Sequence, residues 1–321
     1  MLRSIAKDAA ATVASWTRLD AAARSGAYIV GYHRVVERVD AHKDFALPAM
    51  EVSIEMLEKH LDWLGRNFEI ISVDDAAATK SRKRSKPLAA VTFDDGYADV
   101  FYNAFPLLKR KGIPATIFVV TDLIGTKQVP LHDRLYAVLS HARRPNPFAA
   151  TQRLLRTHDY DGVVDVIHRL DADGRICGNA PTALHPLTWQ MLAEMRDAGM
   201  TIGSHSKTHA FLTKESARRV REELRESRAA LQKNLGIEAD LFAYPGGDFN
   251  ASVVDAVHAA GYRLAFSICR HRDARRPMLT IERRGLWQRS CLDRFGRFSP
   301  AIMSCHAAAL FGRAANCPNQ H

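Results

Sequence analysis

The stretch LAAVTFDDGY, residues 88–97, decides which fold the chain adopts and where its chemistry lies. Residues 88–93 are apolar or β-branched, and such a short run predicts a buried strand. Two carboxylates, Asp94 and Asp95, follow where that strand ends. Because like charges this close are costly without a cation or a proton between them, the pair indicates a functional site. Asp-Gly is also common in plain turns, so a turn is the competing interpretation.

Strand-like and helical segments alternate on both sides of this stretch. Further strands are predicted at 27–33, 68–73, 114–120, 200–205, 241–245, 262–267 and 278–283. Helical patterns lie between them at 53–67, 100–112, 187–199, 214–236 and 252–261. Apolar strands that alternate with helices predict a parallel sheet covered on its faces, which is the α/β sandwich or barrel class.

Three segments lie outside this alternation. Residues 125–186 are polar and Pro-rich with short helical pieces, so we expect a helical insertion within one domain that spans 27–290. Residues 1–26 carry apolar side chains at helical spacing and predict an N-terminal amphipathic helix. Residues 291–321 form a basic C-terminal tail.

The composition is that of a soluble globular protein. The 321 residues are 47% hydrophobic and 25% charged, which excludes collagen, coiled coils and wholesale disorder. We find no apolar run of about 18 residues and no signal-peptide pattern, so we expect a cytoplasmic protein.

The net charge of +10 is concentrated near the C-terminal end. Residues 261–321 contain eleven arginines, no lysine and three acidic residues. This distribution indicates either a solvated surface or peripheral contact with an anionic membrane. No RNA- or DNA-binding motif accompanies it, so we expect no nucleic-acid partner.

A second polar motif, GSHSKTH at 203–209, follows another predicted strand. It places His205 and His209 four residues apart, so one helical turn or a compact loop aims both imidazoles at a common point. Two histidines with one carboxylate are a frequent ligand set for a catalytic divalent metal. Because the carboxyl ends of parallel strands share one edge of the sheet, we expect both motifs at the same site.

These motifs resemble those of the polysaccharide deacetylases with a NodB homology domain, carbohydrate esterase family 4. The resemblance runs from about residue 27 to about residue 287 and rests on TFDDGY (92–97), HSKTH (205–209) and the segment NAFPLLKRKGIPATIFVV (103–120). It implies a distorted (β/α) barrel of about seven strands and metal-dependent hydrolysis of an N-acetyl group on an amino sugar.

The resemblance also implies a role for each matching residue. Asp95, His205 and His209 correspond to the metal ligands, and Asp94 corresponds to the general base. Zinc is the expected ion, although cobalt and nickel suit the same ligands. A ligated carboxylate holds the metal, while the free carboxylate beside it takes the proton from water.

The chain departs from the family pattern in its third motif, which usually reads R-x-P-Y. Here the segment is FAYPGGDFN, residues 242–250, without the arginine and the tyrosine. The backbone N–H of Gly246 is a candidate oxyanion donor, and a tight turn is the alternative. Arg283 or Arg284 is a candidate to orient Asp94, and a solvated arginine pair is the competing interpretation.

The late Leu-His motif that supplies the general acid is also missing. His33, in VGYHRVV at the end of the first predicted strand, is our candidate, because the layout resembles the circularly permuted deacetylases of exopolysaccharide biosynthesis. A neutral core histidine is the alternative role for His33. The Cys305-His306 pair in the tail is a weaker candidate for the acid.

The sequence therefore predicts an N-deacetylase of an N-acetylated polysaccharide, oligosaccharide or glycan precursor. The alternatives are an amidohydrolase that acts on a non-sugar amide, and an inactive module that binds glycans. The four residues Asp94, Asp95, His205 and His209 argue against a pure binding module, because binding requires no general base.

Overall fold

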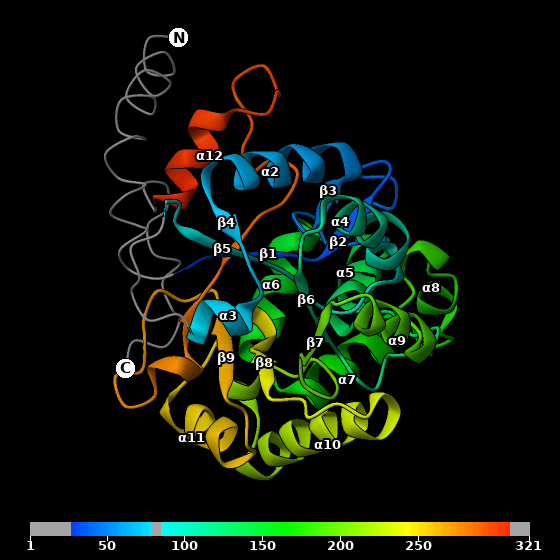
Figure 1. The fold of residues 1–321 in the computed structure, drawn as a ribbon. Coiled ribbons are helices and arrows are strands. Elements are labelled where there is room, and N and C mark those ends of the chain that lie inside the picture. Colours follow the sequence, from blue (N-terminus) through cyan, green and yellow to red (C-terminus); the bar gives the residue numbers. More distant parts are fainter. Residues whose placement is uncertain (1–26, 79–84, 309–321) are drawn as a thin grey trace.

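The computed structural model describes residues 27–78 and 85–308, and its centre is a sheet of nine parallel strands (Figure 1). Eight strands follow the order β10-β9-β8-β7-β6-β5-β1-β11, and β4 pairs with β5 outside this path. The strands are β1 (Tyr28–Tyr32), β4 (Glu69–Ile70), β5 (Leu88–Phe93), β6 (Ala115–Val119), β7 (Thr201–Ser204), β8 (Leu241–Ala243), β9 (Leu264–Ser267), β10 (Ile281–Glu282) and β11 (Arg284–Gly285).

The two ends of this sheet meet at one residue. The terminal strands β10 and β11 are separated in the chain only by Arg283, so the sheet bends until it is nearly closed. The expected distorted (β/α) barrel is thereby confirmed. The short strand β11 was not predicted, because two residues carry no periodic signal.

Helices cover the outside of the sheet (Figure 1). The predicted helices are present as α2 (Ile54–Asn67), α9 (Trp189–Asp197), α10 (Ala217–Leu235) and α11 (Ala251–Ala259), and residues 100–112 form a π-helical turn (Val100–Ala104) followed by α4 (Phe105–Lys111). The side chains of Ser53, Thr188 and Ser216 accept a backbone N–H in the first turns of α2, α9 and α10. These caps satisfy donors that a helix leaves unpaired, which explains where the helices begin.

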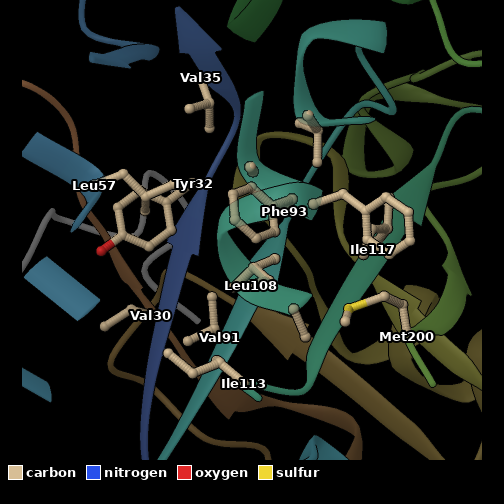
Figure 2. Packing of buried hydrophobic residues seen from close by; sticks show 14 of the residues in the cluster. Val30, Tyr32, Val35, Leu57, Val91, Phe93, Leu108, Ile113, Ile117 and Met200 are labelled. Atoms are coloured by element: carbon tan, nitrogen blue, oxygen red, sulfur yellow. The ribbon is translucent and has the colours of Figure 1, made fainter. Parts of the chain in front are cut away.

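Apolar side chains on both faces of the central strands build two cores. One core joins the strands to helices α2 and α4, and Figure 2 shows members of it: Val30, Tyr32, Leu57, Val91, Phe93, Leu108 and Ile117. Alternate residues of β1, β5 and β6 form a smaller cluster with residues of β8 and β9; it includes Ile29, Ala90, Phe118, Leu241 and Phe266. Burial on both faces explains why these strands are continuous apolar runs rather than alternating ones.

The segment 125–186, predicted as an insertion, contains four helices. They are α5 (Leu131–His141), α6 (Pro147–Thr157), α7 (Tyr160–Leu170) and α8 (Arg175–Gly178). Buried residues of α5, α6 and α7 pack into a cluster of their own, with Leu135, Leu155 and Ile167 among its members. Helices α5 and α6 provide one wall of the site described below.

A two-stranded parallel sheet of β2 (Arg34–Val36) and β3 (Glu51–Ser53) was not predicted. Arg34 holds it from the inside: this guanidinium is 1% exposed and forms ion pairs with Glu51 at 2.7 Å and Asp99 at 3.0 Å. The loop between β2 and β3 contributes residues 47–50 to the site.

Two predicted segments, 1–26 and 291–321, extend beyond the described residues. The N-terminal helix at 1–26 lies outside the described residues, as does the tail beyond residue 308. The described part of the tail forms the short helix α12 (Pro300–Ala307), beside α2 in Figure 1. Within residues 27–78 and 85–308, no helix has the length and hydropathy that a membrane crossing requires.

Candidate active site

A cavity of about 300 Å³ lies at the carboxyl ends of the barrel strands. Among the predicted site residues, its wall contains His33, Asp94, His205, His209, Gly246 and Arg283. These residues follow β1, β5, β7, β8 and β10. Residues as distant in the sequence as His33 and Arg283 therefore lie at the same edge of the sheet. This is the edge at which parallel α/β sheets bind their ligands.

Asp95 is buried beside the cavity in a strained conformation. Its φ angle is +68°, in the left-handed region that side chains other than glycine rarely adopt. The carboxylate is 1% exposed, and neither oxygen has a hydrogen-bond partner among the described residues. A buried carboxylate without donors is costly, so this geometry fits a group that binds a cation.

Two imidazoles face Asp95. The Nε2 atoms of His205 and His209 lie 3.4 and 3.2 Å from Asp95 Oδ1. The Nδ1–H of His205 donates to the carbonyl of Ala243 at 2.8 Å, which leaves the Nε2 lone pair directed toward Asp95. A histidine that ligates a metal is usually oriented by such a bond. Burial by itself raises the pKa of a carboxyl group, yet His209 and the other nearby imidazoles hold the pKa of Asp95 well below its usual range.

The two histidines lie on a compact loop rather than on a helical turn. His209 is itself in the left-handed region, with φ +66°, and its N–H donates to Ser206 Oγ at 3.0 Å. Glu223 of α10 clamps this loop, because its carboxylate accepts the N–H of Lys207 at 2.9 Å and the N–H and hydroxyl of Thr208 at 2.8 and 2.7 Å. Glu223 was not predicted, since in the sequence it looks like any charge on a solvated helix, although it is fully buried.

Asp94 binds an arginine through both of its oxygens. The Nη1 and Nη2 atoms of Arg283 donate to its two oxygens, each at 2.7 Å, and Nη1 also donates to Thr92 Oγ1 at 2.9 Å. Burial raises the pKa of Asp94, but the Arg283 guanidinium outweighs that effect and keeps the pKa below its ordinary value.

The structure thus separates the two candidate arginines. Arg283 contacts Asp94, whereas Arg284 forms an ion pair with Glu282 at 2.9 Å and does not line the cavity. Arg284 is therefore not brought to the predicted site. Neighbours in an extended segment point to opposite sides, and the sequence pattern does not say which of the two points inward.

His33 lies between β1 and β2 and lines the cavity with Asp94. Burial lowers the pKa of His33, while the carboxylates of Asp95 and Asp94 oppose this effect. His306, the weaker candidate for the acid, lies in α12 and is not among the residues that line the cavity.

Gly246 is in the turn after β8, with φ +65°. A Cβ atom at this position would lie 2.3 Å from the ring of Phe211, so only glycine fits the turn against that ring. The next N–H, of Gly247, donates to the carbonyl of Tyr244 at 2.8 Å and is already used by the turn.

A fourth imidazole, His132 of α5, also lines the cavity. Asp95, His132 and His209 each offer a ligand atom within 4.8 Å of the other two. From the sequence His132 is a candidate to border the site, but without a geometry, because the helix that carries it belongs to the insertion. The only signal in the sequence was its place beside Asp133 and Arg134.

Comparisons with known proteins agree with this architecture. The sequence model of the family described as polysaccharide deacetylase matches residues 81–265. YxkH of Bacillus subtilis is 22% identical over 219 residues, which cover 67% of this chain and 58% of that protein. The poly-β-1,6-N-acetyl-D-glucosamine N-deacetylase of Escherichia coli K12 is 24% identical over 228 residues, covering 68% of this chain and 31% of that protein. The chain thus spans less than two thirds of the length of either relative.

Solved structures share the fold at low sequence identity. IcaB from Ammonifex degensii superposes with a TM-score of 0.57 at 18% identity, covering 88% of this chain and 97% of that one. The Streptococcus pyogenes deacetylase PplD, in complex with acetate, gives 0.56 at 19% identity, with 83% and 94% covered. The matched region includes both carboxylates and both histidines of the site, and it exceeds half of the sequence. The chain therefore belongs to the polysaccharide deacetylase family.

Proposed function

We propose that the protein hydrolyses N-acetyl groups on the amino sugars of a polysaccharide, an oligosaccharide or a glycan precursor, with one divalent metal ion as cofactor. The observation that carries this proposal is the convergence on one cavity of an arginine-bound carboxylate and a second carboxylate faced by imidazoles. This arrangement supplies a proton acceptor next to a candidate cation site.

Asp95, His205 and His209 are the proposed ligands. Their fit to a cation rests on the two buried oxygens of Asp95, which have no donors among the described residues. Zinc is the proposed ion, and cobalt or nickel would suit the same donors. Such an ion, when bound, polarises the acetyl carbonyl and lowers the pKa of water.

Asp94 is the proposed general base. Arg283 holds its carboxylate in one orientation and favours the ionised form, so the group is ready to accept a proton from the attacking water. Gly246, through its backbone N–H at the cavity wall, is the proposed donor to the oxyanion.

His33 is the proposed general acid. It lines the same cavity as Asp94, which supports a role in protonating the departing amine nitrogen. Without that proton the sugar amine is a poor leaving group, so this role completes the hydrolysis.

An amino sugar as substrate is supported by the rim of the cavity. Phe148 and Trp287 line it and are 38% and 37% exposed, which is unusual for large apolar side chains. Flat aromatic faces of this kind suit stacking against the apolar faces of a sugar ring. The curated E. coli relative is named for deacetylation of poly-β-1,6-N-acetyl-D-glucosamine, and we propose an exopolysaccharide of that class as substrate.

We propose further that the protein acts in the cytoplasm, with its basic C-terminal segment against an anionic membrane surface. Fractionation of cells that express the full chain tests both points. Recovery of the protein in the culture medium would contradict them.

The test of the activity is acetate release from N-acetylglucosamine oligomers. We expect chelator-treated protein to be inactive and to recover activity with Zn²⁺, Co²⁺ or Ni²⁺. Asp95→Asn should lose metal binding, whereas Asp94→Asn should keep it and lose roughly 10²–10⁴ in rate, the usual contribution of a general base.

The outcomes separate this proposal from its alternatives. Metal binding with acetate released only from non-sugar amides would favour an amidohydrolase of another class. Metal binding with oligosaccharide affinity and no turnover would indicate a glycan-binding module. Either result contradicts the proposed deacetylase activity.

A further inference from the structure

We propose that His132 is a positioning residue that holds Asp95 and His209 in place for metal binding, and that Tyr97 and Asp133 fix His132 in turn. The inference rests on the proposed metal site of Asp95, His205 and His209. It adds to that site a network of three buried side chains, Tyr97, His132 and Asp133.

The hydrogen bonds of Tyr97 determine the tautomer of His132. Tyr97 Oη lies 2.7 Å from Asp133 Oδ2 and 2.9 Å from His132 Nε2. An ionised carboxylate only accepts, and a hydroxyl carries one proton, so Tyr97 donates to Asp133. The Tyr97 oxygen then accepts the Nε2–H of His132. Asp133 Oδ1 accepts the N–H of Leu47 at 2.8 Å, which anchors the far end of the network.

This tautomer takes Nε2 of His132, which lies 3.8 Å from Asp95 Oδ2, out of metal binding. A metal binds an imidazole through an unprotonated nitrogen, and Nε2 of His132 is committed as a donor. His205 has the reverse arrangement, because its Nδ1–H is bound to Ala243 and its Nε2 is free. Although His132 forms a close group with Asp95 and His209, the hydrogen bonds favour His205 as the third ligand.

His132 nevertheless contacts two of the three proposed ligands, Asp95 and His209. Its Nε2 atom lies 3.8 Å from Asp95 Oδ2, and its ring packs edge-on against the ring of His209 with centroids 5.0 Å apart. Asp95 Oδ1 faces His205 and His209 instead. His132 therefore confines one oxygen of the carboxylate and leaves the other for the ion.

The network is buried, so water cannot supply a hydrogen bond that one of its side chains loses. Tyr97 and Asp133 are each 1% exposed and His132 is 2% exposed. A partly satisfied polar network in such surroundings is costly, and loss of one member leaves the others unpaired. Because His132 and Asp133 belong to α5, the insertion is joined directly to the metal site through Tyr97.

The test is the Zn²⁺ dissociation constant of the full chain, measured by competition with a chromophoric chelator. We expect Tyr97→Phe and His132→Leu each to weaken zinc binding by about 10–100-fold, the usual effect of losing an outer partner of a metal ligand. His132→Gln places an amide donor where Nε2 lies and should keep most of the affinity. The double variant Tyr97→Phe/His132→Leu should bind no more weakly than His132→Leu, since both changes break the same network.

The matched control is Tyr136→Phe, which removes another buried hydroxyl, on the same helix as His132, one that donates to the Lys43 carbonyl at 2.9 Å and does not line the cavity. It should leave zinc binding unchanged. Thermal unfolding of each metal-free variant separates lost affinity from lost folding, and the His132→Gln and His132→Leu pair serves if Tyr97→Phe does not fold.

Each outcome decides the matter. Zinc binding by Tyr97→Phe at the wild-type level would overturn the network. Equal losses in His132→Gln and His132→Leu would show that His132 is a ligand and overturn its positioning role. If the wild-type chain binds no zinc, cobalt or nickel, both the proposed function and this inference are wrong. If the wild-type chain binds zinc and the variants bind it equally well, only this inference is wrong.

Discussion

Asp94 and Asp95 are neighbours in the chain, yet they have different partners. Asp94 is gripped by Arg283, and Asp95 is surrounded by imidazoles without a hydrogen bond among the described residues. The divergence follows from the backbone, because β5 ends at Phe93 and Asp95 turns into the left-handed region. The proposed division of labour between a base and a ligand therefore depends on one strained residue.

The residue types of the site were predictable from the sequence, but their partners were not. The motifs at 92–97 and 203–209 predicted the four central side chains, because carboxylates and histidines stand where strands end. Arg283 and Arg284 were indistinguishable, since the choice depends on which side of a two-residue strand faces inward. Glu223 and His132 lie in segments whose patterns show only a charged helix and an insertion.

Arg283→Lys tests the bidentate contact between Arg283 and Asp94. Lysine keeps the charge and loses the two-pronged contact, so one hydrogen bond to a charged group is lost, about 1.5–3 kcal/mol. We expect acetate release to fall roughly 10–100-fold in kcat/KM while zinc affinity stays unchanged. Arg284→Lys is the matched control one residue away and should behave like wild type. Equal activity of the two variants would show that the Asp94 contact does not matter for turnover.

At the scale of elements, the apolar pattern of the sequence predicted the longer strands and the long helices. It did not predict the shortest strands. β5 occupies the six residues predicted for it, and α2 and α10 begin at side chains able to cap them. β2, β3 and β11 have two or three residues each, and their pairing is fixed by partners distant in sequence. A buried ion pair at Arg34 and the closure of the sheet create them, and neither leaves a local pattern.

Glu223→Gln probes the helix that holds the histidine loop. The amide oxygen can replace only part of the carboxylate that accepts from Lys207 and Thr208. We expect about 1–3 kcal/mol less stability in urea unfolding and faster amide hydrogen exchange at 207–209. The neighbouring Glu222→Gln, at an exposed pair with Arg218, should cost less than about 0.5 kcal/mol. Similar losses in both would contradict the clamp.

Gly203→Ala probes how tightly β7 packs into the barrel. A Cβ atom there would lie 2.6 Å from the ring of Phe118 and 3.2 Å from the carbonyl oxygen of Leu241. We expect a destabilisation of about 1–3 kcal/mol, typical of overpacking. Gly65→Ala in α2, where a Cβ meets nothing within 4 Å, should instead stabilise by about 0.5–1 kcal/mol. Thermal unfolding of both variants measures the contrast, and a neutral Gly203→Ala would mean that the ring moves aside freely.

On the scale of the whole molecule, the barrel has polar side chains inside its apolar cores, and some of them oppose folding in acid. His60 of α2 is fully buried, with Nδ1 3.2 Å from the hydroxyl of Tyr32 and the ring against Phe298. Burial lowers the pKa of His60 to about 4. Protonation of His60 therefore favours the unfolded chain.

The sign of the effect follows from proton binding. Between about pH 4 and pH 6.5 the unfolded chain binds more protons at His60 than the folded one, so the free energy of unfolding falls as the pH drops through this window. The full difference is about 3 kcal/mol for this one group. Urea unfolding of wild type and His60→Leu at pH 7 and pH 4.5 measures it. The acid-induced loss should be smaller in His60→Leu than in wild type or in the exposed variant His258→Leu, and an identical loss in all three would contradict the prediction.

The place where the sheet nearly closes, between β10 and β11, has a consequence for when the protein gains activity during synthesis. Arg283, the single connector between β10 and β11, is also the residue that grips Asp94. A nascent chain that has not yet emerged past this point carries both aspartates and both histidines but lacks Arg283, which orients Asp94. Activity should accordingly appear late in synthesis. Cleavage of the chain just before β10 should abolish activity although both aspartates and both histidines are still present.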